Sequence, residues 1–115
     1  RVETQESAPG RFNIRATTGE QPHVVFSTHM DTVPPFIGTS EDDEYIHGRG
    51  SCDATGIIAA QIFAAGALRS RGMHNVGLLF TVDEGLGSEG AKAANDHPLA
   101  REFSTIGDAG AHVLR

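Results

Sequence analysis

Acidic and imidazole side chains follow several apolar segments of this sequence. His29 and Asp31 come directly after the β-branched run 24–28, and Asp83 and Glu84 come after a second apolar run. A neutral imidazole is a good metal ligand, and a carboxylate two residues away can accept its other N–H and fix the orientation of the ring. Taken alone, a histidine at a strand end explains the first pair equally well, because short motifs are weak evidence.

Hydrophobic patterning predicts the strands that must position these side chains. Alternation predicts a half-exposed strand at 11–16, and dense apolar runs predict buried strands at 23–27 and 75–82. A further short strand is expected at 103–106, whereas the polar residues 1–10 are expected to form a loop that turns at Pro9-Gly10.

Two helices are expected between these strands. The alanine-rich segment 57–71 places one apolar stripe on a helical face, formed by Ile58, Ile62 and Ala65. Asp53 lies just before this helix, where the simplest role of a carboxylate is that of an N-cap. A shorter helix is expected at about 88–95, with Ser88 as a natural N-cap.

The alternation of strands and helices predicts an α/β domain with a mostly parallel sheet and helical crossovers. The carboxyl ends of parallel strands share one edge, which would bring together the pairs His29/Asp31 and Asp83/Glu84, with Asp108 from the next strand. One histidine among several carboxylates is the donor set of a two-metal hydrolytic site, in which an unligated carboxylate takes a proton from water.

Composition narrows the classes of partner. The chain has 115 residues, a formal net charge of −6 and a single cysteine. The negative charge disfavours nucleic acid as a partner, and the lack of a long apolar stretch disfavours a membrane. One cysteine excludes an internal disulfide and fits a reducing cytoplasm, where we expect the protein to be located.

Three motifs, in order, resemble the M20 metallopeptidase family. They lie at residues 28–34 (THMDTVP), 48–56 (GRGSCDATG) and 81–91 (TVDEGLGSEGA), and the likeness extends over about 11–108. The family contains glutamate carboxypeptidase, acetylornithine deacetylase, succinyl-diaminopimelate desuccinylase and aminoacylase enzymes. The resemblance implies part of a zinc-peptidase-like catalytic domain, and hydrolysis of a peptide or an N-acyl amino acid near a free carboxylate.

The resemblance also implies a role for each candidate residue. His29 binds one metal, and Asp31 is the carboxylate behind it. Asp53 bridges two metals, Glu84 is the general base, and Asp108 falls where the family has an acidic ligand. Zinc is the expected metal, as one or two ions, with Co²⁺ or Mn²⁺ as alternatives.

Two departures from the family pattern bear on activity. The family has a second acid after the general base, where this chain has Gly85, so we expect a weak or absent second metal and impaired hydrolysis. From the resemblance we expect residues 1–115 to be a partial, metal-binding catalytic domain, with the lid and dimerisation domain and a final histidine ligand of the family absent from it. The expected protein partner is the remainder of that domain or another copy of the chain, and whether the chain alone is an enzyme stays open.

Two other functions are compatible with parts of the sequence. A non-catalytic metal-binding or interaction fragment agrees with Gly85. A dinucleotide-binding domain agrees with the spacing Gly85-x-Gly87-x-x-Gly90. The second alternative is disfavoured because Asp83 and Glu84 would repel a pyrophosphate.

Overall fold

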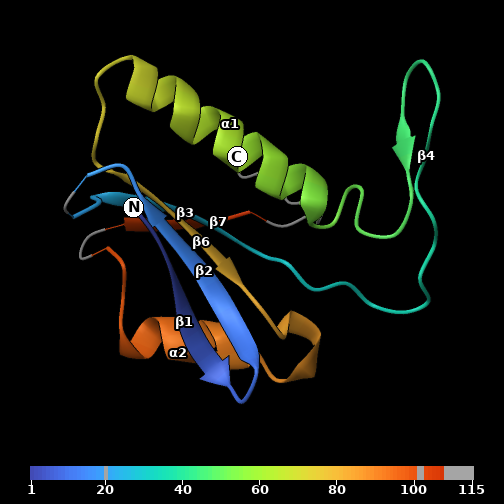
Figure 1. Ribbon diagram of the computed structural model, residues 1–115, viewed down its shortest axis with the longest axis horizontal. Helices are drawn as coiled ribbons and strands as arrows, with labels where there is room; N and C mark the ends of the chain where they lie inside the picture. Colours follow the sequence, from blue (N-terminus) through green and yellow to red (C-terminus); the bar gives the residue numbers. More distant parts are fainter. Residues whose placement is uncertain (20, 101–102, 108–115) are drawn as a thin grey trace, which may run out of the picture.

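The computed structural model describes residues 1–19, 21–100 and 103–107, and they form an α/β arrangement with a helix on each face of a sheet (Figure 1). The five-stranded sheet has the order β1-β2-β6-β3-β7, and its strands are β1 (Val2–Ala8), β2 (Arg11–Thr17), β6 (Val76–Thr81), β3 (Val24–His29) and β7 (Phe103–Ile106). The two covering helices are α1 (Thr55–Ser70) and α2 (Glu89–Asp96), and a separate hairpin pairs β4 (Ser40–Glu41) with β5 (Ile46–His47).

The sheet is mixed, so the prediction of a mostly parallel sheet is not confirmed. β3 pairs in parallel with β6 and with β7, whereas β1–β2, β2–β6 and the β4–β5 hairpin are antiparallel. The difference follows from the connections. Parallel strands need a long crossover. α1 supplies it between the neighbours β3 and β6, and α2 lies in the crossover from β6 to β7, which pairs with β3, whereas the tight turn at Gly10 can join only antiparallel strands.

β1 occupies residues that were expected to form a loop. Three of its four half-buried positions are polar, at Glu3, Gln5 and Ser7, so the strand lacks the apolar alternation by which strands are recognised. The inward-facing Gln5 side chain donates a hydrogen bond of 2.9 Å to the carbonyl oxygen of Ala93 in α2. Polar side chains therefore help to join this edge strand to the helix.

The core lies on both faces of the central strands. Phe80 and Val25 are almost fully buried on opposite faces, because Phe80 is level with Thr28 in the parallel register and Thr28 is three positions from Val25 along β3. On α1, Ala65 is buried, whereas Ile62 is 50% exposed. The expected place of Ile62 on the inward face of this helix is therefore wrong. Ile58 and Ala65 do lie on the inward face, and Ile62 lies outside it. The buried and half-buried residues of α1 are Ile57, Ile58, Gln61, Ala64, Ala65 and Leu68. Among the described residues, no helix is long and apolar enough to cross a membrane.

Gly90 at the start of α2 allows the helix to approach the sheet closely. A Cβ atom at this position would overlap the Val82 carbonyl oxygen and the side-chain oxygen of Asn13. Gly66, within α1, has no such neighbour, because nothing lies within 4 Å of its Cβ position. The two glycines therefore differ in what an added methyl group would meet.

We predict opposite effects of alanine at these two positions. Gly90→Ala should lower the free energy of unfolding by about 1–3 kcal/mol, because the backbone must move to admit the methyl group. Gly66→Ala should raise it by about 0.5–1 kcal/mol through helix propensity. Urea denaturation followed by circular dichroism measures both, and equal stability of the two variants would contradict this account.

Candidate active site

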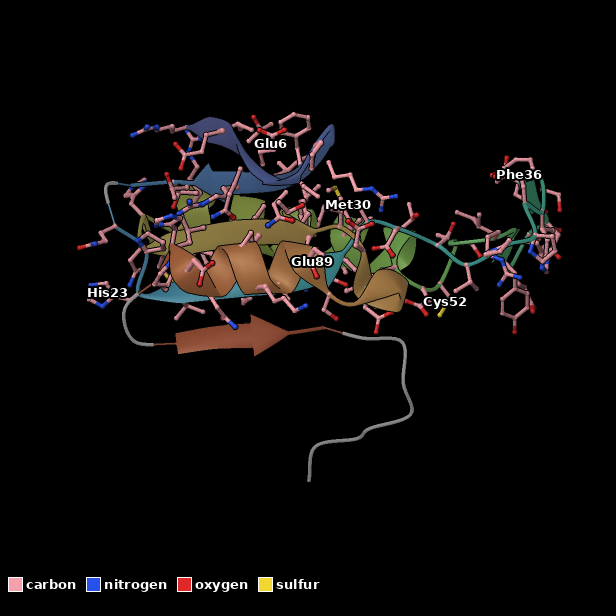
Figure 2. All side chains as sticks on the ribbon, turned by 90° about the horizontal axis from the view of Figure 1, so that it is seen from below. Glu6, His23, Met30, Phe36, Cys52 and Glu89 are labelled. Atoms are coloured by element: carbon pink, nitrogen blue, oxygen red, sulfur yellow. The ribbon has the colours of Figure 1, made fainter. Side chains whose placement is uncertain are left out.

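Four of the five predicted site residues line one cavity of about 200 Å³. They are His29, Asp31, Asp53 and Glu84. The cavity lies beyond the carboxyl ends of β3 and β6, on the side from which the β4–β5 hairpin projects, and Met30 and Cys52 mark this end of the molecule in Figure 2. Asp108, the fifth predicted residue, lies outside the described residues.

His29 is held through both of its ring nitrogens. Nδ1 is 2.8 Å from the main-chain oxygen of Asp31, and Nε2 is 2.8 Å from Oδ1 of Asp53. Both partners are acceptors, so each nitrogen must carry a hydrogen for both bonds to form, and the ring is then an imidazolium. Burial lowers the pKa of His29, but the bonds to Asp31 and Asp53 and their charges outweigh it and raise the pKa above 6.5.

Asp31 supports the site in a different way from the one expected. Its main-chain carbonyl, rather than its carboxylate, accepts the hydrogen bond from His29, and the carboxylate oxygen lies 3.7 Å from Nδ1. The same carboxylate accepts a hydrogen bond of 3.2 Å from the main-chain N–H of Glu84. Asp31 therefore links the end of β3 to the segment that follows β6.

Asp53 does not cap the helix that follows it. The N-cap of α1 is Ala54, and the helix has no side-chain cap. The Asp53 carboxylate is about half exposed and is directed to His29 instead. The N-cap role that is simplest for an isolated aspartate is wrong here, and the residue lines the cavity.

Glu84 begins the short 3₁₀-helix η1 (Glu84–Leu86), and Gly85 lines the cavity beside it. Nothing lies within 4 Å of the position that a Cβ atom of Gly85 would take, and its backbone is not in the left-handed region. A side chain therefore fits at this position. Ser88 is the N-cap of α2 as expected, but its hydroxyl donates to the Glu84 carbonyl oxygen rather than capping the helix.

The described part of the chain supplies an incomplete set of metal ligands. His29 and Asp53 offer a nitrogen and an oxygen of the kinds that zinc prefers, converging on one point. No group of three His, Cys, Asp or Glu side chains within the described ranges is arranged to hold a metal. The donor atoms of His29 and Asp53 are therefore of the right kinds for zinc. Here the two atoms share a hydrogen bond, and a bound metal would replace the proton between them.

Arg11 and Asn13 both support this region from β2, although no motif in the sequence indicates a role for either. Arg11 forms an ion pair with the buried carboxylate of Asp83, and Asn13 is wholly buried against the residues around α2. An asparagine at an inward position of a strand is the one signal that could have indicated such a role, because a buried amide needs partners.

We predict a raised pKa for His29 in the metal-free protein. An NMR titration should give a value above 6.5, and Asp53→Asn should lower it by removing the negative partner. Because the folded-state pKa is raised, the stability that ionised His29 contributes is fully present below about pH 6.5 and is lost as the pH rises through the folded-state pKa. A His29 pKa at or below 6.5 in the folded protein would contradict this assignment.

Comparisons with known proteins agree on one family. The sequence profile of peptidase family M20/M25/M40 matches residues 25–114. A probable carboxypeptidase of Aspergillus terreus is 43% identical over 77% of this chain, and one of Aspergillus flavus is 37% identical over 90%. These matches cover 22% and 27% of the two proteins, so the chain spans about a quarter of their length.

A solved structure shares the fold. A tripeptidase of Staphylococcus aureus superposes with a TM-score of 0.73 and 28% identity, covering 96% of this chain and 34% of the tripeptidase. The resemblance that was expected from the three motifs is thereby confirmed. The chain belongs to peptidase family M20/M25/M40.

Proposed function

We propose that this chain is part of a metal-dependent hydrolase of peptide bonds. The observation that carries the proposal is the convergence of His29, Asp53 and Glu84 on one cavity at the strand ends of an M20-family chain. The relatives named as carboxypeptidases and a tripeptidase favour peptides over N-acyl amino acids as substrates. We expect a small peptide with a free carboxylate.

The residues of the cavity have separate tasks in this proposal. His29 Nε2 and Asp53 would hold the metal, with Asp108 as a further ligand, and the metal would polarise the substrate carbonyl and acidify a water molecule. Asp31 orients the His29 ring through its main-chain carbonyl. Glu84 accepts a proton from the attacking water and returns it to the nitrogen of the breaking amide bond.

Gly85 favours a single metal. A glycine offers no ligand at the position where the family pattern has a second acid, so a second cation would have fewer negative partners. We propose zinc as the metal, with Co²⁺ or Mn²⁺ as alternatives, and slow hydrolysis. The cytoplasmic location, a second copy as a partner and the need for the remainder of a catalytic domain stay predictions.

The alternatives differ in how well the structure supports them. A non-catalytic metal-binding or interaction fragment is the second candidate, and Gly85 is the observation that favours it. The last glycine of the dinucleotide-binding pattern, Gly90, is explained by packing rather than by a nucleotide, because a side chain there would overlap Val82 and Asn13. The helix after it has only eight residues, Glu89–Asp96.

The first test is zinc binding to the 115-residue chain, measured by calorimetry. We predict that His29→Ala weakens binding at least tenfold, because it removes the nitrogen donor of the pair. The matched control is His47→Ala, since His47 is a solvent-exposed histidine that also pairs with an aspartate, Asp42, at 2.9 Å. Binding that is absent from the folded chain, or equal in both variants, would contradict a metal site at His29.

A second test restores the missing acid. We predict that Gly85→Glu binds zinc at least tenfold more tightly, or binds a second equivalent, and hydrolyses a tripeptide faster than the parent chain. The open space at Gly85 accepts the new side chain, and its carboxylate would face the cavity. Gly66→Glu adds the same charge on α1 and should change neither property, so equal gains in both variants would indicate a nonspecific effect of charge.

A further inference from the structure

Asn13 is a fully buried amide in the middle of β2, and its side chain bonds in two directions. Its Nδ2 donates to the main-chain oxygen of Gly90 at 2.8 Å, and its Oδ1 accepts from the main-chain N–H of Val82 at 3.2 Å. The same Nδ2 lies 3.2 Å from Oε1 of Gln5 on the neighbouring strand. Every hydrogen bond of this side chain therefore stays within the protein.

These two main-chain bonds hold both ends of the segment that carries Glu84. β6 ends at Thr81 and α2 begins at Glu89, so Val82 and Gly90 flank the irregular stretch between them. Within that stretch the Ser88 N–H donates to the Asp83 carbonyl oxygen at 2.8 Å. A short turn is thus closed upon itself and joined to β2 through one side chain.

Arg11 supplies a second anchor from the same strand. Residues two apart in a strand face the same side, so Arg11 and Asn13 approach this segment together. Arg11 pairs with the carboxylate of Asp83, whose side chain is 6% exposed and whose φ of 64° lies in the left-handed region. This conformation is unfavourable for a residue other than glycine, so the contacts around Asp83 hold it in place.

We propose that Asn13 is a positioning residue that fixes Glu84 at the cavity, assisted by Arg11 through Asp83. The inference rests on the proposed function, in which Glu84 handles protons. A group that transfers a proton must be placed within a fraction of an ångström, and small displacements are costly in rate. The Glu84 side chain is exposed, so its placement depends on the main-chain segment beneath it.

The choice of asparagine follows from the two contacts. Val82 presents an N–H and Gly90 presents a carbonyl oxygen, so the side chain must accept and donate at once. An amide does both, whereas a carboxylate can only accept and would face the Gly90 oxygen without a hydrogen. Asn13→Asp should therefore keep the bond to Val82 and lose the bond to Gly90, whereas Asn13→Ala loses both.

Amide hydrogen exchange of the 115-residue chain tests the proposal directly. Asn13→Ala should accelerate exchange of the Val82, Glu84 and Ser88 amides at least tenfold more than exchange within the β3–β6 pairing. Asn13→Asp should keep more of the protection at Val82 than at Ser88. The control is Thr18→Val, which removes a comparable bond of 3.1 Å to the Val76 carbonyl oxygen at the other end of β6.

A uniform acceleration in the Asn13 variants, equal to that of Thr18→Val, would overturn the proposal, and so would unchanged exchange at Glu84. If Asn13→Ala does not fold, Asn13→Asp decides by the same comparison. Where the parent chain hydrolyses a tripeptide, Asn13→Ala should lower kcat at least tenfold and leave KM unchanged, and an unaltered kcat would overturn the proposal. A parent chain without hydrolysis counts against the proposed function alone, because exchange still decides the positioning role.

Discussion

The parallel pairing of β3 with β6 is the constraint on which the site depends. His29 is paired with Thr81, the last residue of β6, and the Met30 N–H continues the pairing with a bond of 2.8 Å to the Thr81 carbonyl oxygen. The two strands therefore end level with one another. Because they end level, the residues that follow them meet, and the Asp31 carboxylate reaches the main-chain N–H of Glu84 without any further element between them.

Charge at this edge is balanced by contacts from several directions. Asp31, Asp53 and Glu84 line one cavity with His29, and the negative charges of these three carboxylates repel one another. A protonated His29 ring would offset part of this charge, and Arg11 pairs with the carboxylate of Asp83, the residue before Glu84. An arrangement of this kind attracts a cation, which is consistent with the metal-dependent chemistry that we propose.

Local patterns predicted what local interactions determine. The strand Phe103–Ile106 and the main body of α1 were predicted correctly, and the three motifs indicated four residues that do line one cavity. The strand β1 was not predicted because most of its inward residues are polar. Whether neighbouring strands run parallel or antiparallel depends on pairings between distant segments, which the pattern of one segment does not determine. Asn13 meets Gly90 across 77 positions of sequence, so its role becomes visible only when the two are in contact.

The open space at Gly85 means that the residue at this position can affect the chemistry of the cavity without affecting the packing of the fold. No neighbouring atom lies within 4 Å of the position of a Cβ atom at Gly85, so an acidic side chain there would not displace the packing around the cavity. Selection for a stable fold would therefore neither remove the glycine nor restore the acid. A single substitution could reverse the change, and only selection for the reaction itself would retain the result.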